Sequence, residues 1–271
     1  MTPSSKIELY NQDCREGLEQ KLDKKSVDLV VTSPPYNLGI DYNVYDDSRS
    51  RESYLQWIAD WAQQVKEVLA DSGSLFLNLG SKPSDRWVPH EVLFRLREYF
   101  ELQNEIHWIK SITVQEEGEN ISVGHYKPVN SERFVNGCHE YIFHLTKDGD
   151  VPLERLEIGV PYKDKSNIDR WDSTDDDVRC RGNTWFIPYE TITSSSDDRP
   201  HPASFPPRLA EMAIRLHGVD KIEKVMDPFL GIGSSALAAE KLELDFIGFE
   251  IDEQYLRTAQ KRLKEYQPQL F

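Results

Sequence analysis

The chain has 271 residues, of which 38% are apolar and 29% charged, and its formal net charge is −15. This length and composition predict one sizeable core, or a core with a smaller inserted region. The acidic balance excludes a protein that coats nucleic acid indiscriminately, because that role needs clustered Lys and Arg, although a local basic face would suffice for DNA. The sequence has no run of about 18 apolar residues and no basic leader, so we expect a cytoplasmic protein without a membrane segment.

The three cysteines, Cys14, Cys138 and Cys180, are odd in number and widely spaced. The sequence contains no Cys-x-x-Cys pair of the kind used in zinc or redox sites. The histidines also lack the spacing of metal ligands. We therefore predict neither structural disulfides nor a metal site.

The first hundred residues predict alternating strands and helices. Residues 26–32 form a β-branched run that ends at two prolines, which stop a strand and begin a loop. Apolar residues then recur at three- and four-residue intervals over 51–70, the pattern of an amphipathic helix, which we expect Asp71-Ser72-Gly73 to close. A strand at 74–79, a helix at 88–100 and a strand at 103–109 follow. This order is typical of a parallel α/β sheet.

The periodicity breaks up between Lys110 and Pro200 and then returns. The later elements are a helix at 206–217, a strand at 224–226, a helix at 235–242, a strand at 246–249 and a final helix from Asp252. Two α/β portions flanking an irregular middle predict two halves of one sheet. We therefore expect residues 1–110 and 200–271 to form one domain, with an inserted region at 111–199.

A glycine-bearing turn joins the strand at 224–226 to the next helix. It reads Asp227-Pro228-Phe229-Leu230-Gly231-Ile232-Gly233-Ser234, and Glu250 ends the following strand. Glycines let a ligand approach the backbone, and a carboxylate one strand over can accept both hydroxyls of a ribose, so the turn indicates an adenosine-type site. Two alternatives remain on this segment alone. The spacing Gly231-x-Gly233-x-x-Ala236 also fits a nicotinamide-dinucleotide fingerprint, and glycines serve tight turns without any ligand.

The loop after the first strand reads Ser33-Pro34-Pro35-Tyr36. An exocyclic base amine is a poor nucleophile, and acceptors for its N–H groups would draw its nitrogen toward tetrahedral geometry. The Ser33 hydroxyl and the Pro34 carbonyl are candidate acceptors, because prolines fix the backbone and donate nothing. Tyr36 offers a flat face on which a flipped-out base can stack. The alternative is that the prolines only end a strand and Tyr36 caps a core.

The loop and the turn together resemble those of the amino-methyltransferases of restriction–modification type. In that family a Ser/Asp/Asn-Pro-Pro-Tyr/Phe/Trp loop is catalytic, and an Asp-Pro-Phe-x-Gly-x-Gly-Ser/Thr turn binds S-adenosylmethionine. The resemblance covers most of the chain except the middle, and it implies a Rossmann-like S-adenosylmethionine-dependent methyltransferase fold. The loop precedes the turn, as in the circularly permuted β-group of the family, whose target-recognition region lies between the halves. The resemblance therefore gives the 111–199 region that role.

The resemblance also implies a set of site residues. Ser33, Pro34, Pro35 and Tyr36 would be catalytic. The implied cofactor-binding residues are Asp13, Cys14, Phe205, Asp227, Pro228, Phe229, Gly231, Gly233, Ser234 and Glu250. Within this set Asp13 would accept from the cofactor's amino group, unless it is only a solvated loop aspartate, and Phe205 would close over the methionine end.

The resemblance further implies a substrate and partners. A serine at the first loop position goes mostly with cytosine N4 in the family, and aspartate or asparagine mostly with adenine N6, so Ser33 favours N4-methylation. A C5-cytosine enzyme is disfavoured because it needs a cysteine nucleophile after a proline, an arrangement that this sequence lacks. The implied partner is double-stranded DNA with the target base flipped out. A cognate restriction endonuclease and a homodimer are further expectations.

Candidate DNA contacts in the middle region are basic and aromatic. They are Lys110, His125, Lys127, Arg133, Lys163, Lys165, Arg170, Arg179 and Arg181, with Trp171 and Trp185 between them. Taken singly, each basic residue is better explained as a solvated surface charge than as a DNA contact. Three other functions stay open at this point: an N6-adenine DNA methyltransferase on the same fold, a catalytically inactive DNA-binding relative, and a methyltransferase acting on RNA or a free base.

Overall fold

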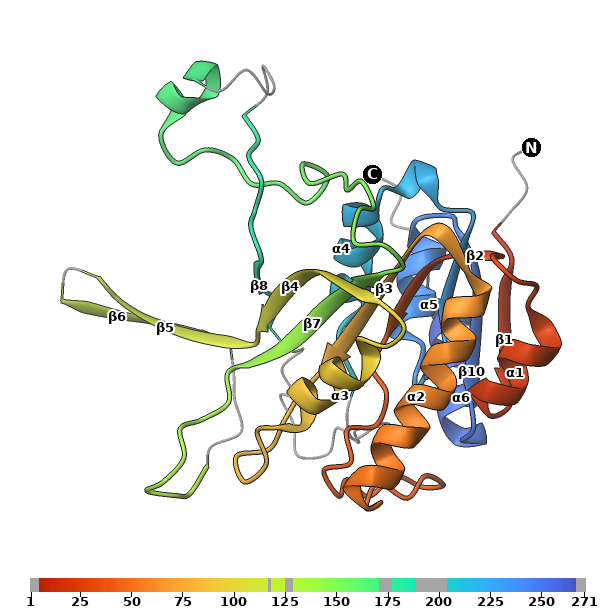
Figure 1. The fold of residues 1–271 in the computed structure, drawn as a ribbon. Helices are drawn as coiled ribbons and strands as arrows, with labels where there is room; N and C mark the ends of the chain where they lie inside the picture. Colours follow the sequence, from red (N-terminus) through yellow and green to blue (C-terminus); the bar gives the residue numbers. More distant parts are fainter. Residues whose placement is uncertain (1–4, 117, 125–128, 171–176, 189–203, 267–271) are drawn as a thin grey trace.

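The computed structural model describes residues 5–116, 118–124, 129–170, 177–188 and 204–266. Its centre is an eight-stranded sheet, from which a two-stranded hairpin projects (Figure 1). The strands are β1 (Ile7–Asn11), β2 (Val27–Thr32), β3 (Leu69–Leu79), β4 (Glu101–Ile109), β5 (Ser111–Glu116), β6 (Glu119–Gly124), β7 (His139–Thr146), β8 (Thr184–Phe186), β9 (Lys224–Asp227) and β10 (Asp245–Glu250). The helices are α1 (Cys14–Lys21), α2 (Arg51–Val68), α3 (Val88–Leu96), α4 (Pro207–His217), α5 (Ser234–Lys241) and α6 (Glu253–Glu265), with short 3-10 helices η1 (Lys165–Arg170) and η2 (Val219–Lys221).

The strand order is β1-β10-β9-β2-β3-β7-β4-β8. Strands β1, β10, β9, β2 and β3 pair in parallel, whereas β7 is antiparallel to both β3 and β4. Near the middle of the sheet β2 pairs with β9, so strands from the two ends of the chain become neighbours. This interleaving is the circularly permuted Rossmann-like arrangement. It brings the carboxyl ends of β1, β2, β9 and β10 to one edge, where open α/β sheets bind ligands.

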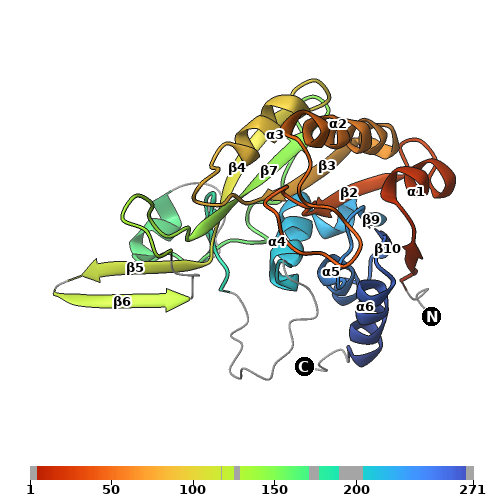
Figure 2. The same ribbon diagram turned by 90° about the horizontal axis from the view of Figure 1, so that it is seen from below.

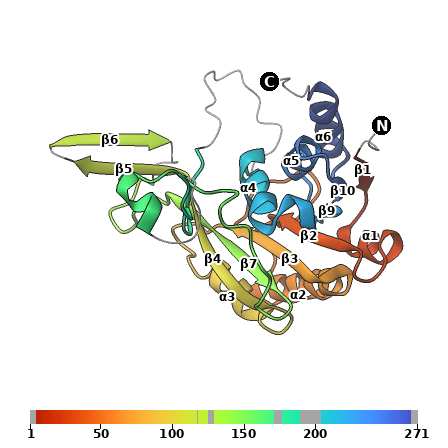
Figure 3. The same ribbon diagram turned by 90° about the horizontal axis from the view of Figure 1, so that it is seen from above.

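Three layers form because both faces of the sheet are apolar. Helices α1, α2 and α3 cover one face and α4, α5 and α6 the other (Figures 2 and 3). In β2, Leu29 and Val31 belong to the cluster beneath α4 to α6, and Val30 to the cluster beneath α1 to α3. A strand buried on both sides needs apolar residues in succession, which explains the β-branched run in the sequence.

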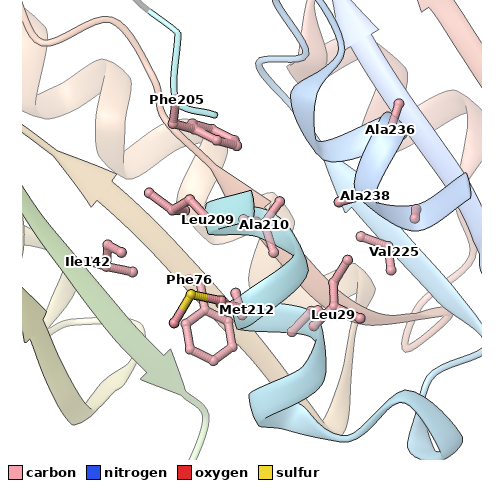
Figure 4. Packing of buried hydrophobic residues seen from close by; sticks show 14 of the residues in the cluster. Leu29, Phe76, Ile142, Phe205, Leu209, Ala210, Met212, Val225, Ala236 and Ala238 are labelled. Carbon is pink, nitrogen blue, oxygen red and sulfur yellow. The ribbon is translucent and has the colours of Figure 1, made fainter. Parts of the chain in front are cut away.

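Helix α4 shows how one helix closes the second layer. Its Leu209 and Ala210 are fully buried, and they lie over Leu29 and Phe76 of the sheet (Figure 4). The helix starts at Pro207, where a missing N–H costs nothing, because the first backbone N–H groups of a helix have no partner within it.

Several expected boundaries were wrong. Helix α2 ends at Val68, and the Asp71-Ser72-Gly73 segment lies within β3 rather than closing the helix. The register explains this, because Val27 pairs with Leu69 while Leu29 pairs with Ser74, so the intervening residues form an irregularity in the strand. Helix α3 ends at Leu96, before the predicted limit of residue 100, and β1 and α1 were not predicted at all.

The expected insertion at 111–199 is not wholly separate from the sheet. Within it β7 lies between β3 and β4, with Ile142 and Phe143 fully buried, and β8 pairs with β4. The β5–β6 hairpin does lie outside the central sheet. Trp185, expected among the DNA contacts, is instead fully buried in the core, so this interpretation was wrong. Among the described residues, none of the helices is long and apolar enough to cross a membrane.

Candidate active site

A cavity lies at the carboxyl edge of β1, β2, β9 and β10. The space between its walls is about 960 Å³, part of it open to solvent. Most of the predicted site residues line it: Asp13, Cys14, Ser33, Pro34, Pro35, Tyr36, Phe205, Pro228, Phe229, Gly231, Ser234 and Glu250. Asp227 and Gly233 stand behind the wall rather than in it. The sheet topology thus brings both sequence motifs to one place.

Asp227 holds the two motifs together. Its fully buried carboxylate accepts hydrogen bonds from the Thr32 hydroxyl at 2.6 Å, the Ser235 hydroxyl at 2.6 Å and the Phe229 N–H at 2.9 Å. Burial raises the pKa of Asp227 to about 6, against the opposing effect of these donors. Its geometry therefore serves the shape of the turn, not direct contact with a ligand.

Gly233 makes the turn into α5 feasible. Its φ of 81° lies in the left-handed region, which favours glycine. A Cβ atom at this position would lie 2.9 Å from the Cβ of Ala259 in α6, so a side chain would also push the two helices apart. Gly233 accordingly allows the sharp entry into α5, at whose first residue, Ser234, the helix meets the cavity.

Glu250 presents a fixed carboxylate to the cavity. One oxygen accepts from the Gly231 N–H at 2.7 Å and the other from the Asp252 N–H at 2.9 Å. Burial raises the pKa of Glu250 to about 7, despite these two donors. Each carboxylate oxygen keeps further capacity to accept, which suits a pair of ribose hydroxyls.

Asp13 lines the cavity and also caps a helix. It is the N-cap of α1, accepting from the Arg15 N–H at 2.9 Å, and it pairs with the Arg15 guanidinium at 2.9 Å. Partial burial opposes its charge, but the hydrogen bonds from Arg15 prevail and hold the pKa of Asp13 below its usual value. Neighbouring Cys14 is buried, and burial raises the pKa of its thiol.

The Ser33-Pro34-Pro35-Tyr36 loop is fixed by hydroxyl groups. The Ser33 and Tyr36 hydroxyl oxygens lie 2.6 Å apart, and the Pro35 carbonyl accepts from the Tyr54 hydroxyl at 3.0 Å. Tyr36 is buried and lies against the cavity, while Ser33 is partly exposed. The loop is therefore a rigid wall with a serine hydroxyl directed by its neighbour.

Behind this loop lies a polar cluster that the sequence interpretation missed. Asn78, at the end of β3, donates to the Tyr36 oxygen and to Glu140, each at 2.7 Å, and Glu140 forms an ion pair with Lys110. An asparagine in an otherwise apolar strand end could have signalled Asn78, because carboxyl ends of strands carry site residues in such sheets.

The loop that follows the Ser-Pro-Pro-Tyr segment also lines the cavity, which the sequence did not predict. Buried Asp47 accepts from the backbone N–H groups of Asn37 at 2.7 Å, Leu38 at 3.0 Å and Ile40 at 3.0 Å, which fixes the loop after the Ser-Pro-Pro-Tyr segment. This loop supplies Tyr42 and Tyr45 to the cavity lining. The wall of the cavity thus includes aromatic side chains from this loop.

Some of the candidate DNA contacts bond to other groups in the protein. Lys110 pairs with Glu140, Lys165 pairs with Asp177, and Arg181 donates to the Ile158 carbonyl at 2.8 Å. Arg133, Lys163 and Arg179 are exposed. His125, Lys127, Trp171 and the side chain of Arg170 lie outside the described residues. Among the described residues, no group of three or more His, Cys, Asp or Glu could hold a metal ion.

Comparison with known proteins agrees with this geometry. A family model described as DNA methylase, of the N6/N4 methyltransferase type, matches residues 27–261. The Type II methyltransferase M.ScaI of Streptomyces caespitosus is 29% identical over 99% of this chain and 84% of its own length. The Type II methyltransferase M.BglII of Bacillus subtilis is 28% identical over 93% of this chain and 67% of its own length.

Two solved structures share the fold. The PvuII DNA methyltransferase, described as cytosine-N4-specific, has a TM-score of 0.69 at 19% identity, covering 99% of this chain and 89% of that one. The complex of M1.HpyAVI with S-adenosylmethionine has a TM-score of 0.55 at 22% identity, covering 94% of this chain and 99% of that one. The chain therefore belongs to the DNA methylase family, as a β-group amino-methyltransferase with S-adenosylmethionine as its cofactor.

Proposed function

We propose that this DNA methyltransferase transfers the methyl group of S-adenosylmethionine to the exocyclic N4 amine of cytosine at specific sites in double-stranded DNA. The observation that carries the choice of base is Ser33 at the cavity wall, with its hydroxyl 2.6 Å from that of Tyr36. The name of the PvuII enzyme, cytosine-N4-specific, supports the same choice.

The cavity fits the cofactor chemically. Glu250 offers two oriented oxygens for the ribose hydroxyls, and Gly231 brings backbone close beside them. The first turn of α5, at Ser234, presents backbone N–H groups and the positive end of the helix dipole, which suits the carboxylate of a methionine group. We propose that Phe205, Pro228 and Phe229 enclose the methionine portion, with Asp13 and Cys14 near the adenine.

The chain's own residues prepare the amine for attack. When bound, the cofactor supplies an electrophilic methyl group on a sulfonium. We propose that the Ser33 oxygen and the Pro34 carbonyl accept the two N–H groups of the base, that Pro35 holds the loop rigid, and that the Tyr36 ring packs against the flipped-out base. These contacts align the nitrogen for a direct displacement, so positioning provides most of the rate.

We propose that DNA recognition lies in the 111–199 region outside the central sheet. The β5–β6 hairpin projects from the body of the protein (Figure 1), and Arg133, Lys163 and Arg179 supply exposed positive charge in the same stretch of sequence. Arginine reads guanine edges and lysine holds phosphates. A homodimer and a cognate restriction endonuclease are part of the same proposal, by analogy with restriction–modification enzymes.

The test is mass spectrometry of nucleosides from unmethylated plasmid DNA incubated with the purified protein and S-adenosylmethionine. We expect N4-methylcytosine with the wild type and none with Ser33→Ala, while calorimetry shows that the variant still binds cofactor. N6-methyladenine instead would overturn the choice of base. Cofactor binding without any methylated nucleoside would favour a DNA-binding relative without activity, and turnover that double-stranded DNA fails to stimulate would favour RNA or a free base.

A further inference from the structure

In the hydrogen-bond cluster behind the Ser-Pro-Pro-Tyr loop, the carboxylate of Glu140 determines which hydroxyl donates and which accepts. The Tyr36 hydroxyl lies 3.2 Å from an oxygen of Glu140 and 2.6 Å from the Ser33 oxygen. An ionised carboxylate can only accept, so the single hydroxyl hydrogen of Tyr36 goes to Glu140. The Tyr36 oxygen then accepts from Ser33, so the hydrogen of Ser33 is directed toward Tyr36.

Asn78 reinforces this direction. Its amide nitrogen donates to the Tyr36 oxygen and to the same Glu140 oxygen, each at 2.7 Å, and has a longer contact of 3.3 Å with the Ser33 oxygen. The Tyr36 oxygen thus accepts from Asn78 as well as from Ser33, which matches the two lone pairs of a hydroxyl. A Tyr36 hydroxyl that donated to Ser33 would leave the carboxylate without this donor.

Lys110 compensates the charge on which this direction depends. Its ammonium pairs with the other oxygen of Glu140, and the side chains are only 15% and 13% exposed. A buried carboxylate without a partner would be costly, so the pair keeps a negative charge beside Tyr36. Both residues stand behind the cavity wall and do not line it.

Gly80 provides the space for this contact. A Cβ atom at Gly80 would lie 2.9 Å from the Tyr36 ring and 3.0 Å from the Glu140 carboxyl carbon. A side chain at this position would therefore separate the phenol from the carboxylate. Glycine allows the close approach of Tyr36 and Glu140.

We propose that Glu140, paired with Lys110, is a positioning residue for methyl transfer that orients the hydroxyl chain from Ser33 through Tyr36. This inference rests on the proposed role of Ser33 and deepens it. With its hydrogen committed to Tyr36, Ser33 presents lone pairs to the N–H of the base amine, which is the orientation that catalysis needs. Glu140 acts through Tyr36 and does not touch the base.

A double-mutant cycle tests the proposal. Glu140→Gln keeps the shape but lets an amide N–H donate to Tyr36, which reverses the chain and turns the Tyr36 hydrogen toward Ser33. We expect kcat to fall about 100-fold, with KM for DNA and cofactor unchanged. Tyr36→Phe keeps the ring but removes the link, and we expect a loss of about tenfold. Adding Glu140→Gln to Tyr36→Phe should then change kcat less than about twofold.

Glu105→Gln is the matched control, because Glu105 is an exposed carboxylate of β4 and should tolerate the same change without loss of activity. Calorimetry of cofactor binding checks that each variant is folded. A Glu140→Gln variant with wild-type kcat, or with an equally large loss in the Tyr36→Phe background, would overturn the proposal.

A second measurement does not depend on activity. With tyrosine labelled at Cζ with ¹³C, the resonance of Tyr36 is assigned by its loss in Tyr36→Phe, and Glu140→Gln should shift it because the phenol no longer donates to a carboxylate. An unchanged resonance would contradict the orientation. A shifted resonance in a protein whose wild type methylates no DNA would uphold the chain's direction while refuting the proposed function.

Discussion

Thr32 and Asp227 are joined by a 2.6 Å hydrogen bond, although they stand 195 positions apart in the sequence. They end neighbouring strands, β2 and β9: Thr32 directly precedes the Ser-Pro-Pro-Tyr loop, and Asp227 is the first residue of the glycine-bearing turn. The Thr32 hydroxyl therefore fixes the position of the glycine-bearing turn relative to the Ser-Pro-Pro-Tyr loop. Alignment of the amine-holding loop with the cofactor turn depends on this buried contact, and small misalignments of reacting groups are costly in rate.

Replacing Thr32 by valine should distinguish the effect of this hydrogen bond from the effect of side-chain packing. Thr32→Val keeps the branched shape but removes one of three donors to a buried carboxylate. We expect the free energy of unfolding to fall by about 1–3 kcal/mol, and kcat to fall with it. Urea unfolding and initial rates measure both effects, and Thr32→Ser, which retains the hydroxyl, should lose much less. A Thr32→Val protein as stable and active as the wild type would show that the contact is dispensable.

Cofactor affinity should depend on pH through Glu250. Its pKa is raised to about 7 by burial, and the carboxylate accepts ribose hydroxyls best when ionised. Affinity should therefore be full above pH 8 and fall up to about tenfold per pH unit below pH 7, since protonation of the site competes with binding. Calorimetry from pH 6 to pH 8.5 measures this, and Glu250→Gln should bind more weakly with a flat profile. A flat wild-type profile would exclude ionised Glu250 as the ribose acceptor.

A buried histidine pair should make stability sensitive to acid. The Ser74 hydroxyl lies 2.9 Å from the His144 ring and 3.0 Å from the His217 ring. Burial lowers the pKa of His144 to about 3 and that of His217 to about 4, from the ordinary value of 6.5. Because both folded values are depressed, the unfolded chain binds more protons below pH 6.5. Stability from this pair is therefore present above pH 6.5 and lost as pH falls toward 4.

The measurement must separate this effect from that of the buried acids. Asp227 and Glu250 have raised pKa values, so their contribution has the opposite sign and is lost as pH rises through about 6 and about 7. We therefore expect the difference in unfolding free energy between His217→Asn and the wild type to shrink below pH 6.5, by up to about 1.4 kcal/mol per pH unit. A difference that stays constant from pH 7 to pH 5 would contradict the assignment of a neutral buried His217.

The conformation of the loop that carries Tyr42 and Tyr45 into the cavity wall should depend on Asp47. Asp47→Ala removes three hydrogen bonds to the loop that carries Tyr42 and Tyr45, so we expect that loop to lose its fixed conformation. Cofactor binding should weaken at least tenfold, since each lost bond is worth about 1 kcal/mol. Calorimetry measures the affinity, and Asp46→Ala provides the control, because Asp46 is exposed and its carboxylate accepts from Ser48 in the same turn. If the two variants bind the cofactor with equal affinity, Asp47 is not needed for the cofactor site.

The sequence predicts the elements whose signals are local. The β-branched run of β2, the apolar periodicity of α2 and the glycine turn before α5 each carry their own pattern, and the structure confirms all three elements. Strand β7 was not assigned to the sheet, because its neighbours β3 and β4 come earlier in the chain and its pairing is non-local. Short β1 and α1 carried too few apolar residues to show a period.

In the site, too, the sequence predicts the residues that belong to local motifs and not their long-range contacts. Ser33 and Glu250 follow directly from motifs, and both line the cavity. The sequence could not show that Asp227 would point to Thr32, or that Glu140 would meet Tyr36 across 104 positions. Such contacts depend on strand order, and a motif reports only its own loop. Residues behind the wall of a site are therefore the ones that sequence patterns miss.

The adjacency of β2 and β9 also bears on how the protein is made. Strand β2 is synthesised well before β9, its partner on one side, because the two strands are far apart in the sequence. During translation the apolar edge of β2 has no parallel neighbour, which is the kind of edge that promotes aggregation. A chain released before β9 would have the catalytic loop but no cofactor turn. The complete binding site can therefore form only after β9 and the turn that follows it have been synthesised, and products truncated before β9 lack it.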